Sequence, residues 1–277
     1  MRSIFFTFIF IGTLFSSYSQ IDSLKKNKTK SKWYYTWGYT RAAYSKSTIH
    51  FKNSSGNPFV TSGPIKNYDF TLHDVTAHDK PDFDKLPDVI NITIPQYVFR
   101  IGYSFNNKWG VEINYDHTKY VVDDWQTARI SGQINGSSVS GDTILNPNTF
   151  VHFEHTDGAN FWMANAVRRW EFYKASKYFA ASLVLKPGAG IVFPRTDVSL
   201  FGERLNNDWH VAGWIVGVET GLRLEFLRNG FFEFVTKGSY ANYARSLVLG
   251  KGNGTASHKI FTGQLTLTMG LRFDSKN

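Results

Sequence analysis

A strict alternation of apolar and polar residues over long segments is the feature that most limits what this chain can form. It is clearest in residues 178–193. One face of an extended segment there carries Phe179, Ala181, Leu183, Leu185, Ala189, Ile191 and Phe193. The other face carries Tyr178, Ala180, Ser182, Lys186, Gly188 and Gly190. A helix repeats every 3.6 residues and would not sort residues in this way, so the segment is predicted to be a β-strand.

Similar segments recur along the chain and predict about eight strands in all. The others are 33–39, 97–105, 111–116, 161–172, 214–226, 231–243 and 261–273. The segment 161–172 is ambiguous because Arg168 and Arg169 are adjacent and one of them must face outward. Pro187 lies inside the best strand and lacks a backbone donor, so we expect a β-bulge there.

The connections between these segments alternate in length. Residues 105–108, 173–177 and 227–230 are tight turns, whereas 45–90, 122–160, 201–210 and 249–257 are long. Short turns on one side and long loops on the other are typical of membrane barrels. The predicted fold class is therefore all-β, a transmembrane antiparallel up-and-down β-barrel of about eight strands. Within the first long loop, residues 65–72 could extend strands above the membrane or fold inward as a cap.

The N-terminus has the pattern of a secretory signal. Arg2 is followed by an apolar run of about a dozen residues, too short to span a membrane, and by small residues before Gln20. A short hydrophobic anchor is the alternative. We expect a signal peptide at 1–19, a basic periplasmic tail at 20–32 and a barrel at 33–277, located in a bacterial outer membrane. Cysteine is absent, which excludes disulfides and thiolate metal sites.

The net charge of +9 is compatible with an acidic partner. Export argues against nucleic acid, so we expect outer-membrane lipids, lipopolysaccharide or another outer-membrane protein as partners. Aromatic residues make up 17% of the chain and many tryptophans lie near strand ends, which favours interfacial girdles. A soluble lipocalin would bury its apolar face instead, and alternation alone does not distinguish the two.

If the apolar faces meet lipid, the polar faces fill the lumen. The charged residues predicted to lie there are Arg100, Glu112, Asp116, Arg169, Glu171, Lys186, Glu219, Arg223, Glu225, Glu233, Lys237 and Arg272. Their signs balance, and an eight-stranded barrel is narrow enough for side chains to fill. This favours an ion-pair plug over a water-filled channel, which needs about twice as many strands.

Histidines suggest two further kinds of site. His152, Glu154, His155 and Asp157 could ligate a metal ion such as zinc if a turn at 156–158 brought them together, since a single extended strand cannot. His78, His117 and His155 are the candidates for a catalytic base in an enzyme that modifies lipid A. We expect no cofactor.

Residues 37–41 (WGYTR), 44–51 (YSKSTIHF) and 68–72 (YDFTL) resemble segments of the uncharacterised outer-membrane β-barrel proteins of flavobacteria and related Bacteroidota. The junction of Ser19 and Gln20 is similar to their signal cleavage sites. The resemblance implies a barrel in the outer membrane and no catalytic motif. The His-x-Ser-Asn element of lipid A deacylases is absent, since His155 is followed by Thr156 and Asp157. The sequence therefore predicts a non-enzymatic barrel acting through its loops or within a larger complex, with a deacylase-like enzyme as the alternative.

Overall fold

The computed structural model describes residues 32–53, 67–80, 96–155, 157–176, 178–226, 229–249 and 254–274. The predicted signal peptide and nearly all of the predicted basic tail lie outside these residues, as do parts of the first long loop. In the described part of the chain, no helix is long and apolar enough to cross a membrane.

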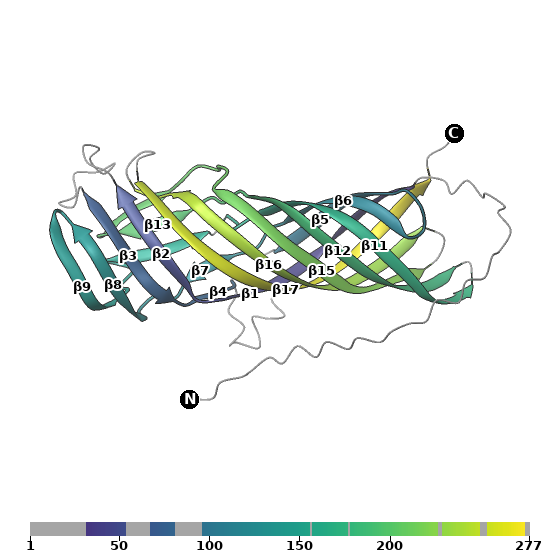
Figure 1. Ribbon diagram of the computed structural model, residues 1–277, viewed down its shortest axis with the longest axis horizontal. Coiled ribbons are helices and arrows are strands. Elements are labelled where there is room, and N and C mark those ends of the chain that lie inside the picture. Colours follow the sequence, from purple (N-terminus) through teal and green to yellow (C-terminus); the bar gives the residue numbers. More distant parts are fainter. Residues whose placement is uncertain are drawn as a thin grey trace, which may run out of the picture.

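Eight antiparallel strands form a closed barrel (Figure 1). In order around the barrel they are β1 (Lys32–Tyr44), β5 (Tyr97–Ser104), β6 (Trp109–Asp116), β11 (Phe161–Ser176), β12 (Phe179–Val192), β15 (Gly213–Phe226), β16 (Gly230–Leu247) and β17 (Gly254–Asp274). The ring closes because β1 pairs with β17 along its whole length, from Lys32 opposite Asp274 to Tyr44 opposite Thr262. The predicted up-and-down barrel of about eight strands is confirmed.

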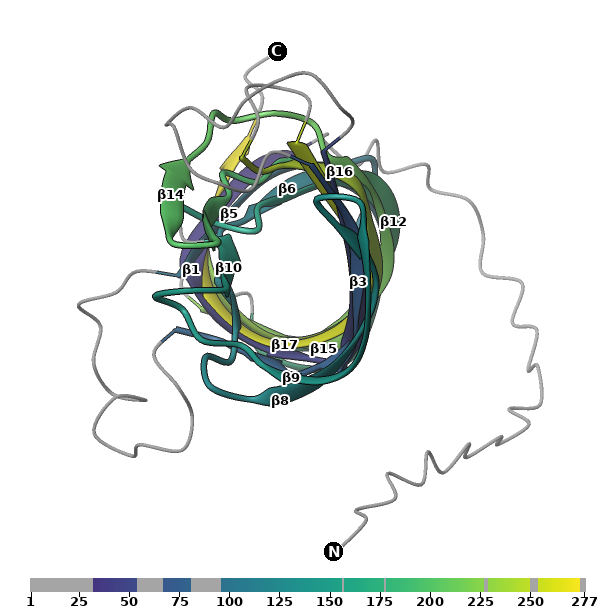
Figure 2. The same ribbon diagram turned by 90° about the vertical axis from the view of Figure 1, so that its left-hand side faces the viewer.

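The long connections fold into further strands that prolong the barrel. The first residues of β17 pair with β2 (Ser47–Asn53), and the sheet continues through β3 (Tyr68–Val75), β8 (Thr127–Ile134) and β9 (Ser137–Ile144). A second sheet has the order β14 (Glu203–Asn206), β13 (Asp197–Leu200), β10 (Val151–His155), β7 (Tyr120–Val122) and β4 (Ala77–His78). We call these nine strands the extension. Seen from that end, β3 continues the wall formed by the barrel strands (Figure 2).

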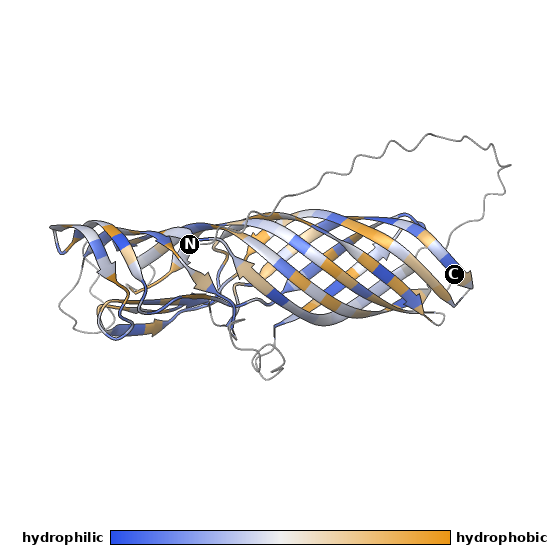
Figure 3. Ribbon diagram, turned by 90° about the horizontal axis from the view of Figure 1, so that it is seen from below, coloured by the Kyte–Doolittle hydropathy of each residue, from blue (hydrophilic) through white to orange (hydrophobic). Residues whose placement is uncertain are grey.

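The outer surface changes character along a single strand, β17. From Phe261 to Phe273 its outward side chains are apolar and exposed, and they include Leu265, Leu267 and Met269. Between Thr255 and Lys259 the outward residues are polar, while Ala256 and Ile260 point inward and are buried. The colours in Figure 3 follow the same alternation along the barrel strands. The barrel is therefore apolar outside and polar inside, and the extension has the opposite arrangement.

The apolar outer belt has the height of a membrane. Phe261 and Phe273 are twelve residues apart on β17. At about 3.3 Å per residue and a strand tilt of about 40°, they span roughly 30 Å, close to the thickness of a hydrocarbon core. Exposed tryptophans lie toward both ends of the barrel strands: Trp33, Trp109, Trp170 and Trp214. This is the girdle arrangement of a membrane barrel rather than the inward apolar face of a lipocalin.

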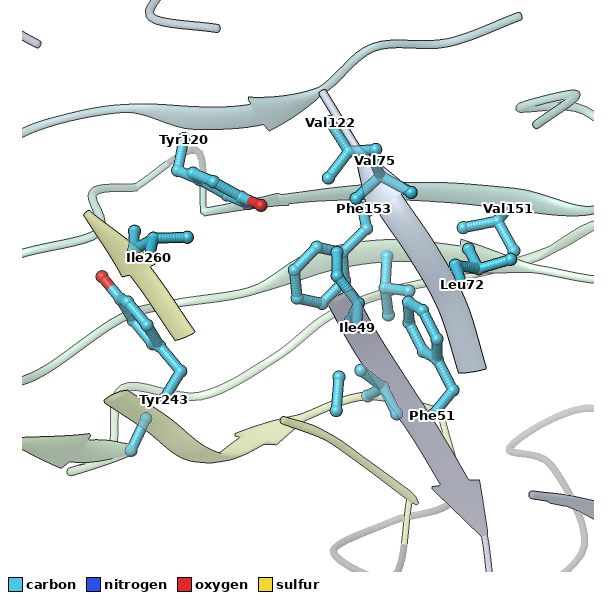
Figure 4. Close-up of a cluster of buried hydrophobic side chains, with 14 of the residues drawn as sticks. Ile49, Phe51, Leu72, Val75, Tyr120, Val122, Val151, Phe153, Tyr243 and Ile260 are labelled. Carbon is cyan, nitrogen blue, oxygen red and sulfur yellow. The ribbon is translucent and has the colours of Figure 1, made fainter. Parts of the chain in front are cut away.

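The extension is held together by a hydrophobic core of its own. Ile49 and Phe51 from β2 pack against Leu72 from β3 and Phe153 from β10, and all four are fully buried (Figure 4). The Phe51 ring stacks on Phe70 with 5.1 Å between ring centroids. Residues 65 and 66 lie outside the described part of the chain, and residues 68–72 belong to β3, so of the two predicted possibilities this part has the strand extension.

The expected bulge at Pro187 is wrong. On the β11 side the ladder pairs Gly188 with Asn165 and Leu185 with Arg168, so the register is the same before and after the proline. On the other side Pro187 lies opposite Val218 in an unbroken ladder. Because proline has no backbone N–H, the pairing with β11 is interrupted at Lys186 and Pro187, but no extra residue is inserted in either strand. The bulges of β11 lie instead between Glu171 and Tyr173 and between Lys174 and Ser176.

Candidate functional site

Eight charged side chains fill the middle of the barrel lumen. Four are cations and four are carboxylates: Arg100, Lys186, Arg223, Lys237, Glu112, Asp116, Glu219 and Glu233. Each side chain is 0–1% exposed. All eight come from inward positions of five strands, as the period-two alternation requires.

Some of the ion pairs join neighbouring strands, such as Arg223 with Glu233, and others cross the lumen. Arg100 on β5 donates from Nη2 to both carboxylate oxygens of Glu219 on β15, at 3.1 and 3.2 Å. Lys186 on β12 donates from Nζ to Glu112 Oε2 on β6 at 3.0 Å and to Glu233 Oε2 on β16 at 2.7 Å. Strands that are not neighbours in the sheet are thereby joined through the barrel interior.

Polar and aromatic side chains add further contacts to this network. The Tyr34 hydroxyl donates to Glu112 Oε2 at 2.8 Å, and Asn114 Nδ2 donates to Glu219 Oε1 at 2.8 Å. The guanidinium of Arg223 donates to Glu233 Oε1 at 2.7 Å and lies 4.0 Å from the centre of the Phe231 ring. Buried charges are tolerated where they are paired and hydrogen-bonded in this way.

The other four predicted lumen charges all lie toward the short-turn end of the barrel. Arg272 donates from Nη1 to Glu225 Oε1 at 2.9 Å, with both side chains mostly buried. Arg169 is buried and donates a hydrogen bond from Nη2 to the carbonyl oxygen of Asn106 in the β5–β6 turn. Glu171 lies at the open end of the lumen: its side chain is 49% exposed and 3.8 Å from Lys174, and its ladder partner on β12 is the buried Ser182. A bulge after Glu171 ends the regular alternation of β11.

A pair of buried histidines lies where the charged lumen meets the apolar extension. Nε2 of His155 on β10 is 3.4 Å from Nε2 of His258 on β17, and Nδ1 of His155 is 3.2 Å from Thr196 Oγ1. His258 comes before Phe261 and so lies on the extension side of the apolar belt. The two imidazoles stack against Tyr243, at 4.8 and 4.7 Å between centroids. Burial lowers the pKa of His258 to about 3, and it lowers the pKa of His155 well below its usual value.

The four predicted metal ligands do not converge on one point, although Nε2 of His152 lies 3.9 Å from Glu154 Oε1. Nδ1 of His152 is 2.8 Å from Asp124 Oδ1, while Glu154 is paired with Lys80 at 3.3 Å. His155 points to His258, and Asp157 pairs with Arg195 at 2.7 Å. Within the described ranges no group of three or more His, Asp or Glu side chains could hold a metal ion.

The three catalytic candidates also lie apart. His78 pairs with Asp123 on the surface of the extension, with Nδ1 2.5 Å from Oδ1. His117 lies at the end of the barrel next to the extension. Its ring stacks on Tyr97 with 4.8 Å between centroids, and its Nδ1 is 2.8 Å from Asn160 Oδ1. Burial, together with Lys119, lowers the pKa of His117. His155 is fully buried, so no two of these histidines share a site.

Sequence reasoning missed His258 and Tyr34 as parts of these clusters. Both occupy inward positions of alternating segments, next to Ile260 and Thr36 respectively. The alternation alone could have placed them inside the molecule, although it could not have named their partners on distant strands.

No protein-family model and no curated protein sequence matches this chain. Among solved structures the chain is similar to Ail, the attachment invasion locus protein of Yersinia pestis, at 15% identity over 88% of this chain and 100% of that chain, with a TM-score of 0.32. It is also similar to OprG of Pseudomonas aeruginosa, at 11% identity over 90% and 98% of the two chains, with a TM-score of 0.38. A third similar structure is that of Neisserial surface protein A, at 12% identity over 87% of this chain and 97% of that chain, with a TM-score of 0.34.

Proposed function

We propose that this protein is a non-enzymatic integral outer-membrane barrel with a sealed lumen, which holds the extension in the extracellular space as a binding platform. The carrying observation is the set of ion pairs that cross the lumen, each between side chains at most 1% exposed. The partner we propose is lipopolysaccharide or another outer-membrane protein, so that the chain would serve as an accessory subunit of a larger complex.

Two successive layers support a sealed interior. A general porin needs a hydrated lumen, whereas the charged side chains here reach across the barrel and neutralise one another. Above them the extension has a dry core that includes Phe51, Phe70 and Phe153. Water or a solute would have to pass an ion network and then a hydrophobic core.

The outer membrane is the membrane that suits this architecture. Barrels that satisfy every backbone group by strand pairing span bacterial outer membranes, and the short turns of such barrels face the periplasm. The extension, built from the long connections, would then lie outside the cell. Its outward residues on β2 and β3, among them Lys52, Asp69 and Thr71, are polar and suited to water.

The enzyme alternative gains no support from the geometry. His155 is enclosed in the core, and His78 and His117 lie on separate parts of the surface. We therefore do not propose lipid A modification; a change in the mass spectrum of lipid A on deletion of the gene would restore that alternative.

Conductance in a planar lipid bilayer tests the sealed lumen directly. The full chain should give no steady conductance. A double variant, Arg100→Ala with Glu219→Ala, removes one cross-lumen pair and should give brief openings, while the exposed pair Lys52→Ala with Asp69→Ala should remain silent. A steady open channel from the unaltered chain would disprove the proposal.

Co-purification tests the platform. The unaltered chain, extracted in mild detergent, should retain lipopolysaccharide or bring down an outer-membrane protein. Recovery of the barrel alone and free of lipopolysaccharide would count against this part of the proposal, without affecting the sealed lumen.

A further inference from the structure

A cavity of about 980 Å³ lies at the short-turn end of the barrel, and we call it the mouth cavity. Five cationic side chains line it: Lys108, Arg168, Arg169, Lys174 and Arg272. Among the residues that the structure describes, only two carboxylates, Glu171 and Glu225, line it with them. The excess of positive charge is local, because the ion network deeper in the lumen has four cations and four carboxylates.

Both carboxylates are already engaged within the cavity. Glu225 accepts from Arg272 Nη1 at 2.9 Å, and Glu171 lies 3.8 Å from the ammonium of Lys174. The described residues offer no carboxylate within ion-pair distance of Lys108, Arg168 or Arg169. Three positive charges thus converge on one cavity without a carboxylate partner.

Arg169 is the most unusual of the three. Arg169 is only 5% exposed. It donates from Nη2 to Ser104 Oγ at 2.7 Å and to the Asn106 carbonyl at 3.2 Å, whereas its buried Nε has no acceptor. A buried guanidinium bonded only to neutral groups is unfavourable unless an anion compensates its charge. An oxyanion beside Nε would provide both the charge and the acceptor.

We propose that the mouth cavity binds a phosphate group, supplied by a lipid headgroup or by free phosphate. A tetrahedral oxyanion can accept hydrogen bonds from several directions, which suits donors on β11, on β17 and in the β5–β6 turn. The depth is suitable as well. Arg168 lies 4.5 Å from the centre of the Trp109 ring and 5.2 Å from that of Trp170, and both tryptophans are exposed at the end of the apolar belt. Membrane aromatics of this kind lie at the level of lipid headgroups.

This proposal does not depend on the sealed lumen or on the extension. It predicts a site on the periplasmic face if the barrel is oriented as proposed above, but the binding chemistry is the same in either orientation.

Thermal unfolding of the full, delipidated chain in a zwitterionic detergent tests the site. The probes are inorganic phosphate, chloride at equal ionic strength, short-chain phosphatidylglycerol and short-chain diacylglycerol, which has the same tails without the phosphate. We expect phosphate to raise Tm above the value in chloride, or phosphatidylglycerol to raise it above the value in diacylglycerol. A response to phosphatidylglycerol alone would identify a lipid headgroup as the source, and an equal response to inorganic phosphate would identify the free ion.

Variants locate the effect within the molecule. Arg169→Gln should abolish the phosphate response, and Lys108→Ala should weaken the apparent affinity by about tenfold, as expected for one lost charge-assisted contact. Arg195→Gln, in the extension, is the control and should leave the response unchanged. Because Arg169→Gln could disturb folding, Lys108→Ala decides independently, since Lys108 is exposed. Equal Tm values in phosphate and chloride together with equal values in the two lipids, or an unchanged response in Lys108→Ala, would overturn the proposal.

Discussion

Lys237 on β16 and Asp116 on β6 are four strands apart in either direction around the barrel, and yet Lys237 Nζ lies 2.6 Å from Asp116 Oδ2. The pair therefore spans the full width of the lumen. Lys237 also lies 3.5 Å from Glu219 Oε1, so the pair is joined to the rest of the network.

Breaking this pair should destabilise the barrel. Lys237→Met leaves Asp116 buried and short of a cation, which costs about 3–5 kcal/mol for a buried pair. The double variant Lys237→Met with Asp116→Asn removes both charges and should be less destabilised than the single variant. Urea unfolding from micelles would measure both. The single variant Asp116→Asn completes the cycle, and simple additivity of the two single substitutions would show that the two side chains are not coupled.

Acid should loosen the extension before it affects the barrel. The folded-state pKa values of His155 and His258 are depressed by burial, so the stability they allow is complete above about pH 6.5 and is lost as the pH falls toward about 3. The expected loss is up to about 1.4 kcal/mol per pH unit for each histidine. Hydrogen exchange of β10 at pH 7.5 and pH 5 would measure it.

Two variants separate this effect from general acid sensitivity. His258→Phe keeps an aromatic ring beside Tyr243 and should reduce the difference between the two pH values. His50→Gln, at an exposed site, should not. Equal protection of β10 at both pH values in the unaltered chain would contradict this account.

The pKa of His152 is shifted in the opposite direction to those of His155 and His258. The carboxylates of Glu154 and Asp124 raise its pKa to about 9, so its contribution is present below about pH 6.5 and is lost as the pH rises through 9. The imidazole resonances followed by NMR should show a midpoint near that value. Asp124→Asn should lower the midpoint, whereas Asp142→Asn, on exposed β9, should not. A midpoint near 6.5 in the unaltered chain would exclude the ion pair in solution.

A cationic substitution should distinguish the lipid-facing part of β17 from its water-facing part. Leu267→Arg places a charge in the middle of the apolar belt and should cost about 2–4 kcal/mol for folding into lipid vesicles. Thr255→Arg puts the same side chain on the outward face of the same strand, within the extension, and should cost little. Similar costs for the two variants would mean that the belt does not contact hydrocarbon.

The barrel could be predicted from the sequence because its strands alternate strongly, as residues 178–193 do. The extension is harder to predict because it comes from the long connections, although Ile49 and Phe51 alternate with His50 and Lys52 in the same way. The strands of the extension are short. Their alternation also does not reveal that their inward residues are apolar, whereas those of the barrel strands are polar. A barrel with polar loops was the simpler interpretation of the same pattern.

The inward placement of the lumen charges could be predicted from the alternation of each strand. On β11 the alternation holds as far as a bulge after Glu171, which the sequence does not announce. The partners of each charge were beyond prediction, because Lys186 and Glu233 are brought together by the curvature of the sheet and not by their separation along the chain. The same holds for His155 and His258.

The continuity of β17 has a mechanical consequence. Its 21 residues run without interruption from the extension into the barrel and are hydrogen-bonded to β16 over most of that length. A pull on the extension would load many of these backbone hydrogen bonds at once in shear. The load would thus be transmitted along β17 to the short-turn end of the barrel.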